Sequence, residues 1–215
     1  MISIQQFVFN EFQENTYVLY DDTSECVIFD PGCRHDFEEK KLTDFISEKK
    51  LTPVKLINTH CHIDHVLGNP FVAKKYDLEL YVHKDELQTY SETGRWAEMF
   101  GLVMEEIPEK KVFINEGDQI KFGSSILDIF FTPGHSIASL TFYNKAEKIC
   151  ISGDVLFQGS IGRTDLPGGN FETLISSIKT KLFSLDDETK VFSGHGNPTT
   201  IGEERLHNPF LNHHE

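Results

Sequence analysis

The sequence predicts a layered αββα or α/β fold, in which mixed β-sheets carry helices on their outer faces. Three observations predict it. Short β-rich segments occur in both halves of the chain, amphipathic segments with helical spacing separate them, and no low-complexity segment or long linker interrupts the 215 residues. We therefore expect one domain over residues 1–215, with two small domains as the alternative. A chain of this length can bury about 70% of the surface that it exposes when unfolded.

The first half alternates strands with helices. Apolar and polar residues alternate over 2–9, and β-rich or apolar runs predict further strands over 16–20, 26–29, 54–57 and 80–82. Phe37, Leu42, Phe45 and Ile46 recur at near-helical spacing, which predicts a surface helix over 36–50. Two further helices are expected over 66–76 and 84–100.

The second half repeats this pattern. Strands are predicted over 111–114, 126–131, 139–143, 149–152 and 191–193. A helix is expected over 171–183, with Asn170 as its N-cap. Thr200 and Glu203 form a capping-box pattern, which predicts a short final helix.

Charge and cysteine content limit the class of protein. The 20 basic and 34 acidic residues give a net charge of −14 at pH 7, which argues against a nucleic-acid partner. Cys26, Cys33, Cys61 and Cys150 form no CxxC pair and fit reduced thiols of a cytosolic protein. Residues 1–6 contain no secretory signal, and no apolar stretch approaches the roughly 18 residues of a membrane span. We expect a cytoplasmic protein that binds neither membrane nor nucleic acid.

The run Thr59-His60-Cys61-His62-Ile63-Asp64-His65 concentrates side chains that bind metals. Alternate side chains of an extended segment share a face, so His60, His62 and Asp64 are expected to converge, with His65 turning in as the strand ends. Imidazole and carboxylate groups are ligands for zinc and similar divalent metals. Structural zinc sites rely on cysteine, and Cys61 is expected to face away. The run therefore indicates a catalytic metal site rather than a polar loop or a structural zinc site.

Three further clusters follow predicted strands: Thr132-Pro133-Gly134-His135-Ser136, Ser152-Gly153-Asp154 and Ser193-Gly194-His195-Gly196. Each places one metal-binding residue beside a glycine, which allows a sharp turn or close backbone packing. One such residue alone is typical of a cap or turn. All three, together with the first run, indicate a shared site.

In this order and spacing, THxHxDH, TPGHS, GD and GHG resemble the motifs of the metallo-β-lactamase superfamily. Within it, the chain resembles the glyoxalase II-type (hydroxyacylglutathione hydrolase-like) metallohydrolases. The resemblance extends from Asp30-Pro31-Gly32 to Gly194-His195-Gly196. It implies an α+β fold, a four-layer αββα sandwich with the site at one edge between its two sheets.

The resemblance also implies two divalent metal ions, zinc or else iron or manganese. Seven ligands are implied: His60, His62 and His135 on one ion, Asp64, His65 and His195 on the other, and Asp154 bridging both. Each ion then keeps an open coordination position, as catalytic sites do. Asp30 is implied to brace the site loops rather than to bind metal; an ordinary turn residue before Pro31-Gly32 is the alternative.

Such a site predicts hydrolysis of an acyl compound. Coordination lowers the pKa of water to about 7, so a metal-bridging hydroxide is the expected nucleophile. Asp64 and Asp154 are the expected catalytic carboxylates, and Asp64 can both ligate and receive a proton. We identify no dedicated general acid, which suits a thioester such as S-lactoylglutathione, because a thiol with a pKa of about 8.5 leaves unprotonated.

Residues 155–169 contain four glycines and Arg163, and we interpret them as a pocket wall. Arg163 is a candidate partner for a substrate carboxylate, or else a structural arginine tied to Asp165 or to backbone carbonyls. Phe157 lines either the acyl pocket or the core, and the core is favoured. The other five histidines are expected at the surface or in loops: His35, His83, His207, His213 and His214.

Substrate and reaction class keep alternatives. Full-length glyoxalase II enzymes hold glutathione with basic residues of an added carboxy-terminal region, whereas only Arg205 occurs in residues 203–210 here, so glutathione use and a broader thioesterase both stay open. Lactones and β-lactams are weaker candidates. Persulfide dioxygenases share the fold and imply one iron on His60, His135 and Asp154, a triad that suits oxygen chemistry. A metal-binding scaffold without activity is the non-enzymatic alternative.

Overall fold

The computed structural model describes residues 1–99 and 106–212. Phe100, His213 and His214, which the predictions above include, lie outside this part. The chain forms two compact units, residues 1–114 with 121–126 and residues 115–120 with 127–215. Each unit contains a mixed β-sheet with helices packed on it, so the fold is α+β, as expected.

The sheet of the first unit has the strand order β1-β2-β3-β4-β5-β6. Its strands are β1 (Ser3–Phe9), β2 (Glu14–Tyr20), β3 (Glu25–Phe29), β4 (Thr52–Ile57), β5 (Leu80–Val82) and β6 (Lys111–Phe113). The first three strands pair antiparallel, whereas β3, β4, β5 and β6 pair parallel. Parallel strands end at the same edge of a sheet. The ligand run, residues 59–65 with their four predicted metal ligands, follows β4 at this edge.

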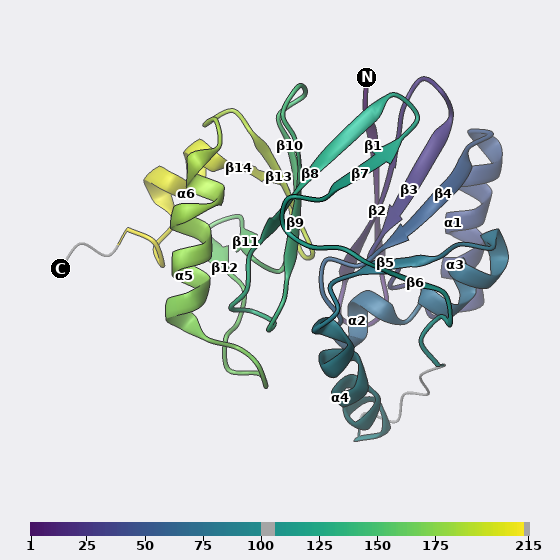
Figure 1. Cartoon of the computed structure of the whole chain (residues 1–215), viewed down its shortest axis with the longest axis horizontal. Coiled ribbons are helices and arrows are strands. Elements are labelled where there is room, and N and C mark those ends of the chain that lie inside the picture. Colours follow the sequence, from purple (N-terminus) through teal and green to yellow (C-terminus); the bar gives the residue numbers. More distant parts are fainter. Residues whose placement is uncertain (100–105, 213–215) are drawn as a thin grey trace. The chain divides into compact units, whose positions relative to one another are not determined.

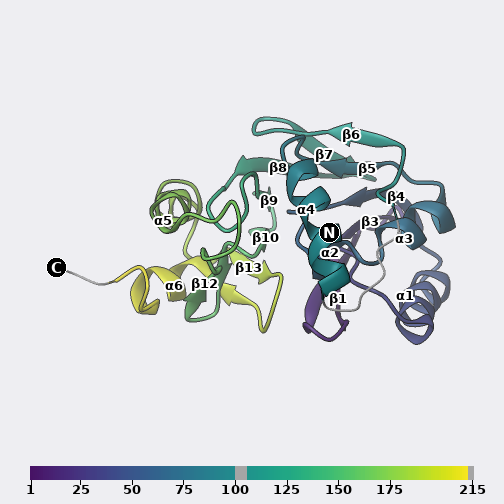
Figure 2. The same ribbon diagram turned by 90° about the horizontal axis from the view of Figure 1, so that it is seen from below.

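Helices α1 (Asp36–Glu48) and α3 (Asn69–Tyr76) cover one face of this sheet (Figures 1 and 2). Leu42 of α1 and Val72 of α3 are completely buried in one core with Ile28 and Leu56. Burial of apolar side chains on both elements stabilises this packing. The short helix α2 (Ile63–Val66) lies next to α4 (Glu86–Met99).

The second sheet has the strand order β14-β13-β10-β9-β8-β7. Its strands are β7 (Gln119–Phe122), β8 (Ser125–Phe131), β9 (Leu140–Asn144), β10 (Ile149–Gly153), β13 (Lys190–Ser193) and β14 (Thr199–Thr200). Strands β7 and β8 each contain residues of both units. A separate two-stranded sheet joins β11 (Leu156–Phe157) to β12 (Ser160–Ile161).

The helices of the second unit are α5 (Phe171–Thr180) and α6 (Ile201–His207), with the 3-10 helix η1 (Leu182–Ser184) after α5. Leu174, Ile178 and Ile201 pack with Cys150 and Val191 of the sheet. Figure 2 shows α5 and α6 on the same side of β10 and β13.

The predicted elements are largely confirmed, including both caps. Asn170 Oδ1 accepts a hydrogen bond from the Thr173 N–H, and Thr200 Oγ1 accepts one from the Glu203 N–H. The single helix predicted over 66–76 is wrong, because the chain breaks at Gly68 between α2 and α3. The Gly68 N–H donates to the Pro31 carbonyl at 2.7 Å, and Pro70 lies in the first turn of α3. Strands β7, β11, β12 and β14 were not predicted, and the last three have only 2 residues each, too few to show a pattern.

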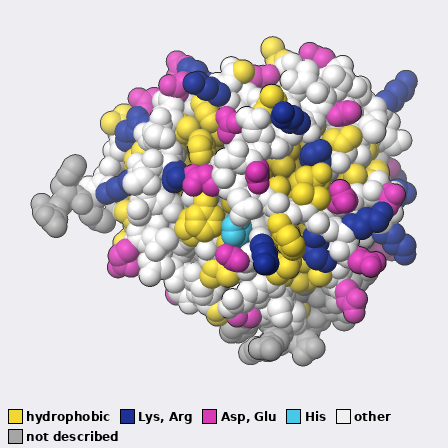
Figure 3. All heavy atoms as spheres, in the orientation of Figure 1, with side chains coloured by type: hydrophobic (Ala, Val, Ile, Leu, Met, Phe, Trp, Pro, Cys, Tyr) yellow, Lys and Arg dark blue, Asp and Glu magenta, His cyan; other side chains and the backbone are white. Residues whose placement is uncertain are grey.

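All four cysteines are free and buried. Within the two described ranges, no helix combines the length and apolar character that crossing a bilayer requires. Acidic and basic side chains are interspersed on the face drawn in Figure 3, with no continuous basic patch there.

Candidate metal centre

The ligand run of the first unit lies between β4 and α2. Residues 58–62 are neither strand nor helix, and the run bends into α2 where the His65 N–H donates to the His62 carbonyl at 3.1 Å. The prediction of an extended run through Asp64 is therefore wrong, because Asp64 and His65 lie on α2. The sequence did not indicate the helical turn that carries two of the four predicted ligands, Asp64 and His65.

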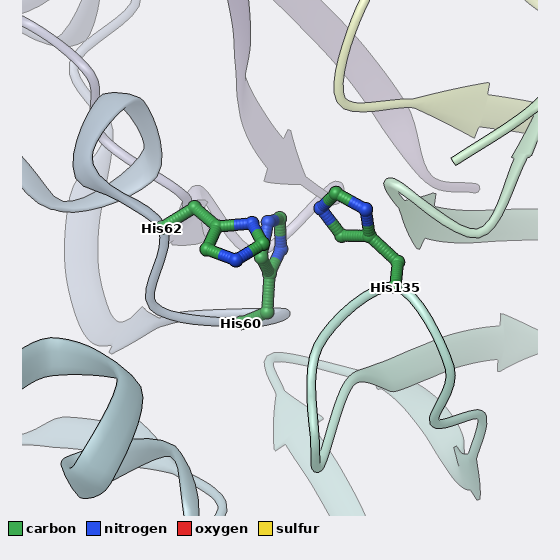
Figure 4. Close-up of side chains that lie close together, drawn as sticks. All are labelled: His60, His62 and His135. Carbon is green, nitrogen blue, oxygen red and sulfur yellow. The ribbon is translucent and has the colours of Figure 1, made fainter. Parts of the chain in front are cut away.

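The run nevertheless brings its four side chains together. The rings of His60 and His62 are perpendicular, with centroids 4.8 Å apart, and Figure 4 shows both on the segment that leads into α2. The His65 ring lies 4.2 Å from that of His60, and its Nε2 atom lies 3.5 Å from Oδ2 of Asp64. His60 and His65 are completely buried, so neither is a surface histidine. Cys61 is buried in the apolar core of this unit, as predicted.

Asp30 braces this run from the end of β3. Its Oδ1 accepts a hydrogen bond from the Thr59 N–H at 2.7 Å, and its Oδ2 accepts one from the Thr59 hydroxyl at 2.6 Å. Oδ2 also lies 3.2 Å from Nδ1 of His65. A carboxylate only accepts, so Nδ1 of His65 carries the proton and Nε2 keeps its lone pair for a metal.

The Thr59 hydroxyl orients the His60 ring in the way that Asp30 orients the His65 ring. Its hydroxyl already donates to Asp30, so it accepts from Nδ1 of His60 at 3.0 Å, and Nε2 of His60 also keeps its lone pair. Ligand atoms of Asp30, His60 and His65 lie within 4.8 Å of one another, which is close enough for a metal. Both Asp30 oxygens accept hydrogen bonds from Thr59, however, and this favours the bracing role.

Glu14 is a buried carboxyl that sequence reasoning missed. Its Oε1 lies 4.0 Å from Nδ1 of His65, and burial raises its pKa well above the ordinary value. A glutamate at the start of an otherwise β-rich run was the only signal in the sequence.

The second unit brings together the three predicted ligands that follow its strands. His135 follows β8, Asp154 follows β10 and His195 follows β13, and β10 and β13 run parallel and so end at one edge. Oδ2 of Asp154 lies 3.5 Å from Nε2 of His135 and 3.5 Å from Nε2 of His195. Nδ1 of His135 donates to the Arg163 carbonyl at 2.7 Å, so the lone pair of this ring lies on Nε2, the nitrogen that a metal would use. Figure 4 shows His135 on its loop.

These spacings fit a first-row divalent metal. Two ligand atoms about 2.1 Å from a tetrahedral zinc ion lie about 3.4 Å from each other. The pairs His135–Asp154, His195–Asp154 and His65–Asp64 are each separated by 3.5 Å. Imidazole nitrogen with carboxylate oxygen suits zinc, iron or manganese.

Arg163 forms the contact expected of a structural arginine, whereas Phe157 lies outside its favoured place in the core. The Arg163 guanidinium is exposed and forms a bidentate ion pair with Asp165, in which both hydrogen bonds are 2.7 Å long. This pairing is the one expected if Arg163 is a structural arginine. The hydrogen bond from Arg163 lowers the pKa of Asp165 to about 2. Phe157 is partly exposed, and its ring centroid lies 6.2 Å from that of His195, so its favoured place in the core is wrong.

Three of the remaining histidines lie in the described ranges. His207 is exposed, His35 is partly exposed and stacks on Phe37, and His83 is partly buried. Among the residues that the structure describes, none of these three belongs to a group of potential metal ligands.

Comparison with known proteins places this geometry in a family. Residues 9–195 match the model of the metallo-β-lactamase superfamily. The probable metallo-hydrolase YqgX of Bacillus subtilis (strain 168) is 42% identical over 201 residues, 93% of each chain. The hydroxyacylglutathione hydrolase GloC of Haemophilus influenzae is 37% identical over 203 residues, 94% of each chain. The crystal structure of TTHA1623 in a di-iron-bound form is similar with a TM-score of 0.86 and 35% identity, over 96% of this chain and 100% of that one.

Proposed function

The chain belongs to the metallo-β-lactamase superfamily, a superfamily of metallo-hydrolases, and from this premise we propose that it is a binuclear metal-dependent hydrolase of thioesters such as S-lactoylglutathione. Its substrate is then a small acyl compound, and the reaction adds water across the C–S bond to give a carboxylate and a thiol. Four free, buried cysteines suit the reducing cytoplasm that we propose as its location.

One observation carries the binuclear proposal: a single oxygen, Oδ2 of Asp154, lies 3.5 Å from Nε2 of both His135 and His195. A separation of 3.5 Å is typical of two ligand atoms on the same metal ion and is longer than an ordinary hydrogen bond. A carboxylate placed equally beside two imidazoles is suited to bridge two ions. The related protein bound to two irons supports this number of metals.

We propose that the two ligand groups complete one centre. The proposed ligands are His60, His62 and His135 for the first ion, Asp64, His65 and His195 for the second, and Asp154 for both. The hydrogen bonds of Asp30, Thr59 and the Arg163 carbonyl support this arrangement, because each fixes an imidazole with Nε2 available as a ligand atom.

When bound, the metals would lower the pKa of coordinated water and polarise the substrate carbonyl. Asp64 and Asp154 are the proposed catalytic carboxylates, and Asp64 is positioned beside His65 to receive a proton. A thiolate departs without a proton more readily than an amine does, which supports a thioester substrate. The 37% identity to a hydroxyacylglutathione hydrolase supports the same substrate class.

The test is elemental analysis of freshly purified protein together with hydrolysis assays on a glutathione thioester, a thioester without glutathione, a lactone and a β-lactam. We expect two metal ions per chain and thioester hydrolysis that chelation abolishes and added metal restores. Faster turnover of the lactone or the β-lactam would contradict the thioester proposal. One equivalent of iron with oxygen uptake on a glutathione persulfide would favour the oxidoreductase alternative.

A further inference from the structure

Helix α4 binds the backbone on both sides of Cys61, the residue between the ligands His60 and His62. Oε2 of Glu86 accepts a hydrogen bond from the Cys61 N–H at 2.8 Å. The Thr93 hydroxyl donates to the Cys61 carbonyl at 3.0 Å. The first bond fixes the peptide plane that joins His60 to Cys61, and the second fixes the plane that joins Cys61 to His62.

Both partners come from one buried face of α4. Glu86 and Thr93 are seven residues apart, which is two helical turns, so their side chains lie on the same side of the helix. Their exposed fractions are 0% and 4%. Helix α4 lies beside α2, the helix that carries Asp64 and His65, as Figure 1 shows.

The backbone of this segment depends on such tertiary hydrogen bonds. Cys61 belongs to neither β4 nor α2, so neither strand pairing nor the hydrogen bonds of α2 hold its backbone. A fully buried carboxylate is expensive to desolvate unless it is hydrogen-bonded, and Glu86 accepts such a bond from the backbone of this loop.

We propose that Glu86 and Thr93 are positioning residues of the metal centre. They hold the Cys61 backbone so that His60 and His62 present their ring nitrogens to the same ion. Neither residue touches the ion or the substrate. This inference rests on the proposed metal-dependent function and adds the residues that support its first ligand pair.

The test measures zinc affinity by competition with a chromophoric chelator, for the wild type, Glu86→Ala, Glu86→Gln, Thr93→Val and Thr93→Ser. We expect Glu86→Ala and Thr93→Val to weaken zinc binding at the site of His60 and His62 by about 10–100-fold, as changes behind metal ligands do. Glu86→Gln and Thr93→Ser keep an acceptor and a hydroxyl, and we expect affinity close to that of the wild type.

Leu87→Ala is the matched control, because Leu87 lies on the same helix and packs against the apolar core of this unit. It should lower the urea midpoint while leaving zinc affinity unchanged. Amide hydrogen exchange in the metal-free protein gives a second measurement, and exchange at Cys61 should be faster in Glu86→Ala than in Leu87→Ala.

Wild-type zinc affinity in both Glu86→Ala and Thr93→Val would overturn the positioning role, even if exchange at Cys61 becomes faster. Equal weakening in Leu87→Ala would overturn it as well, because the effect would then follow stability. If Glu86→Ala fails to fold, the Thr93→Val and Thr93→Ser pair decides alone. A wild-type protein that binds no zinc, iron or manganese would instead contradict the proposed function.

Discussion

The backbone carbonyl of Arg163 accepts a hydrogen bond from Nδ1 of His135 at 2.7 Å. It fixes the ring so that Nε2 lies 3.5 Å from Oδ2 of Asp154. The side chain of Arg163 meanwhile pairs with Asp165 at the surface. Arg163 thus orients a proposed ligand through its backbone and leaves its charge exposed, and the two features can be separated by mutation.

Arg163→Ala removes the charge and retains the carbonyl. We expect metal content and kcat to stay unchanged. On the proposal that the guanidinium leaves Asp165 to bind a substrate carboxylate, KM for a substrate that carries a carboxylate should rise about tenfold, because a charged hydrogen bond is lost. KM for a neutral thioester serves as the control and should not change. A loss of metal in this variant would show that the side chain supports the His135 loop.

Gly162→Ala tests the close approach beside this carbonyl. A Cβ atom at residue 162 would clash with the Asp154 carbonyl oxygen and lie 3.1 Å from Cβ of His135. We expect a loss of about 1–3 kcal/mol in the free energy of unfolding, as for other overpacked sites, together with weaker zinc binding. Urea denaturation and chelator competition measure the two effects.

The control for that change is Gly94→Ala in α4, where a Cβ atom meets no other atom within 4 Å. It should stabilise the protein by about 0.4–1 kcal/mol, because alanine restricts the unfolded chain. A Gly162→Ala protein as stable as the wild type would show that β12 can move away from Asp154.

Asp154→Ala should abolish most of the activity. The side chain lies beside both His135 and His195, so its removal affects the ligands of both proposed ions. We expect kcat/KM to fall by more than the roughly 100-fold typical of changes behind a ligand, and metal content to fall below two ions per chain. Asp186→Asn, a surface change, should behave like the wild type. Full turnover by Asp154→Ala would reject the proposed centre.

Asp30→Asn replaces a carboxylate that accepts from the Thr59 N–H, the Thr59 hydroxyl and Nδ1 of His65 with an amide that has one accepting oxygen. We expect zinc affinity to fall by about 10–100-fold. Stability should fall by about 1–3 kcal/mol, because a buried donor loses its acceptor. The exposed Asp85→Asn is the comparison, and equal zinc binding in both variants would contradict the bracing role.

The lowered pKa of Asp21 predicts how the free energy of unfolding depends on pH. Burial alone would raise its pKa, but hydrogen bonds from Thr23, Ser125 and Ser124 outweigh burial and hold the pKa far below its usual range. A depressed folded-state pKa contributes stability above the unfolded value of about 3.9 and loses it as the pH falls further. The free energy of unfolding should therefore decrease more between pH 5 and pH 3 in the wild type than in Asp21→Asn.

The comparison for that measurement is Asp22→Asn, whose side chain is 86% exposed. Urea unfolding of this variant should follow the wild-type dependence on pH. The same dependence in Asp21→Asn would show that another carboxyl is responsible.

The sequence predicted most strands and helices and all seven proposed ligands. Strand periodicity and capping residues are local signals, so β1, β5, α1 and the caps at Asn170 and Thr200 could be read directly. The break at Gly68 and the placement of Asp64 on α2 could not be predicted in this way, because a helix of 4 residues leaves only a weak pattern in the sequence.

The sequence by itself determined which chemistry this protein offers, since histidine and aspartate beside glycine after successive strands already specify imidazole and carboxylate ligands. Only the tertiary structure decided what orients them: Asp30 for His65, the Arg163 carbonyl for His135, and Glu86 with Thr93 for the Cys61 backbone. Each of these hydrogen bonds joins residues 25 to 35 positions apart. The reason is physical, because ligand type is a property of one residue, whereas its orientation depends on partners that only folding brings within 3 Å or so.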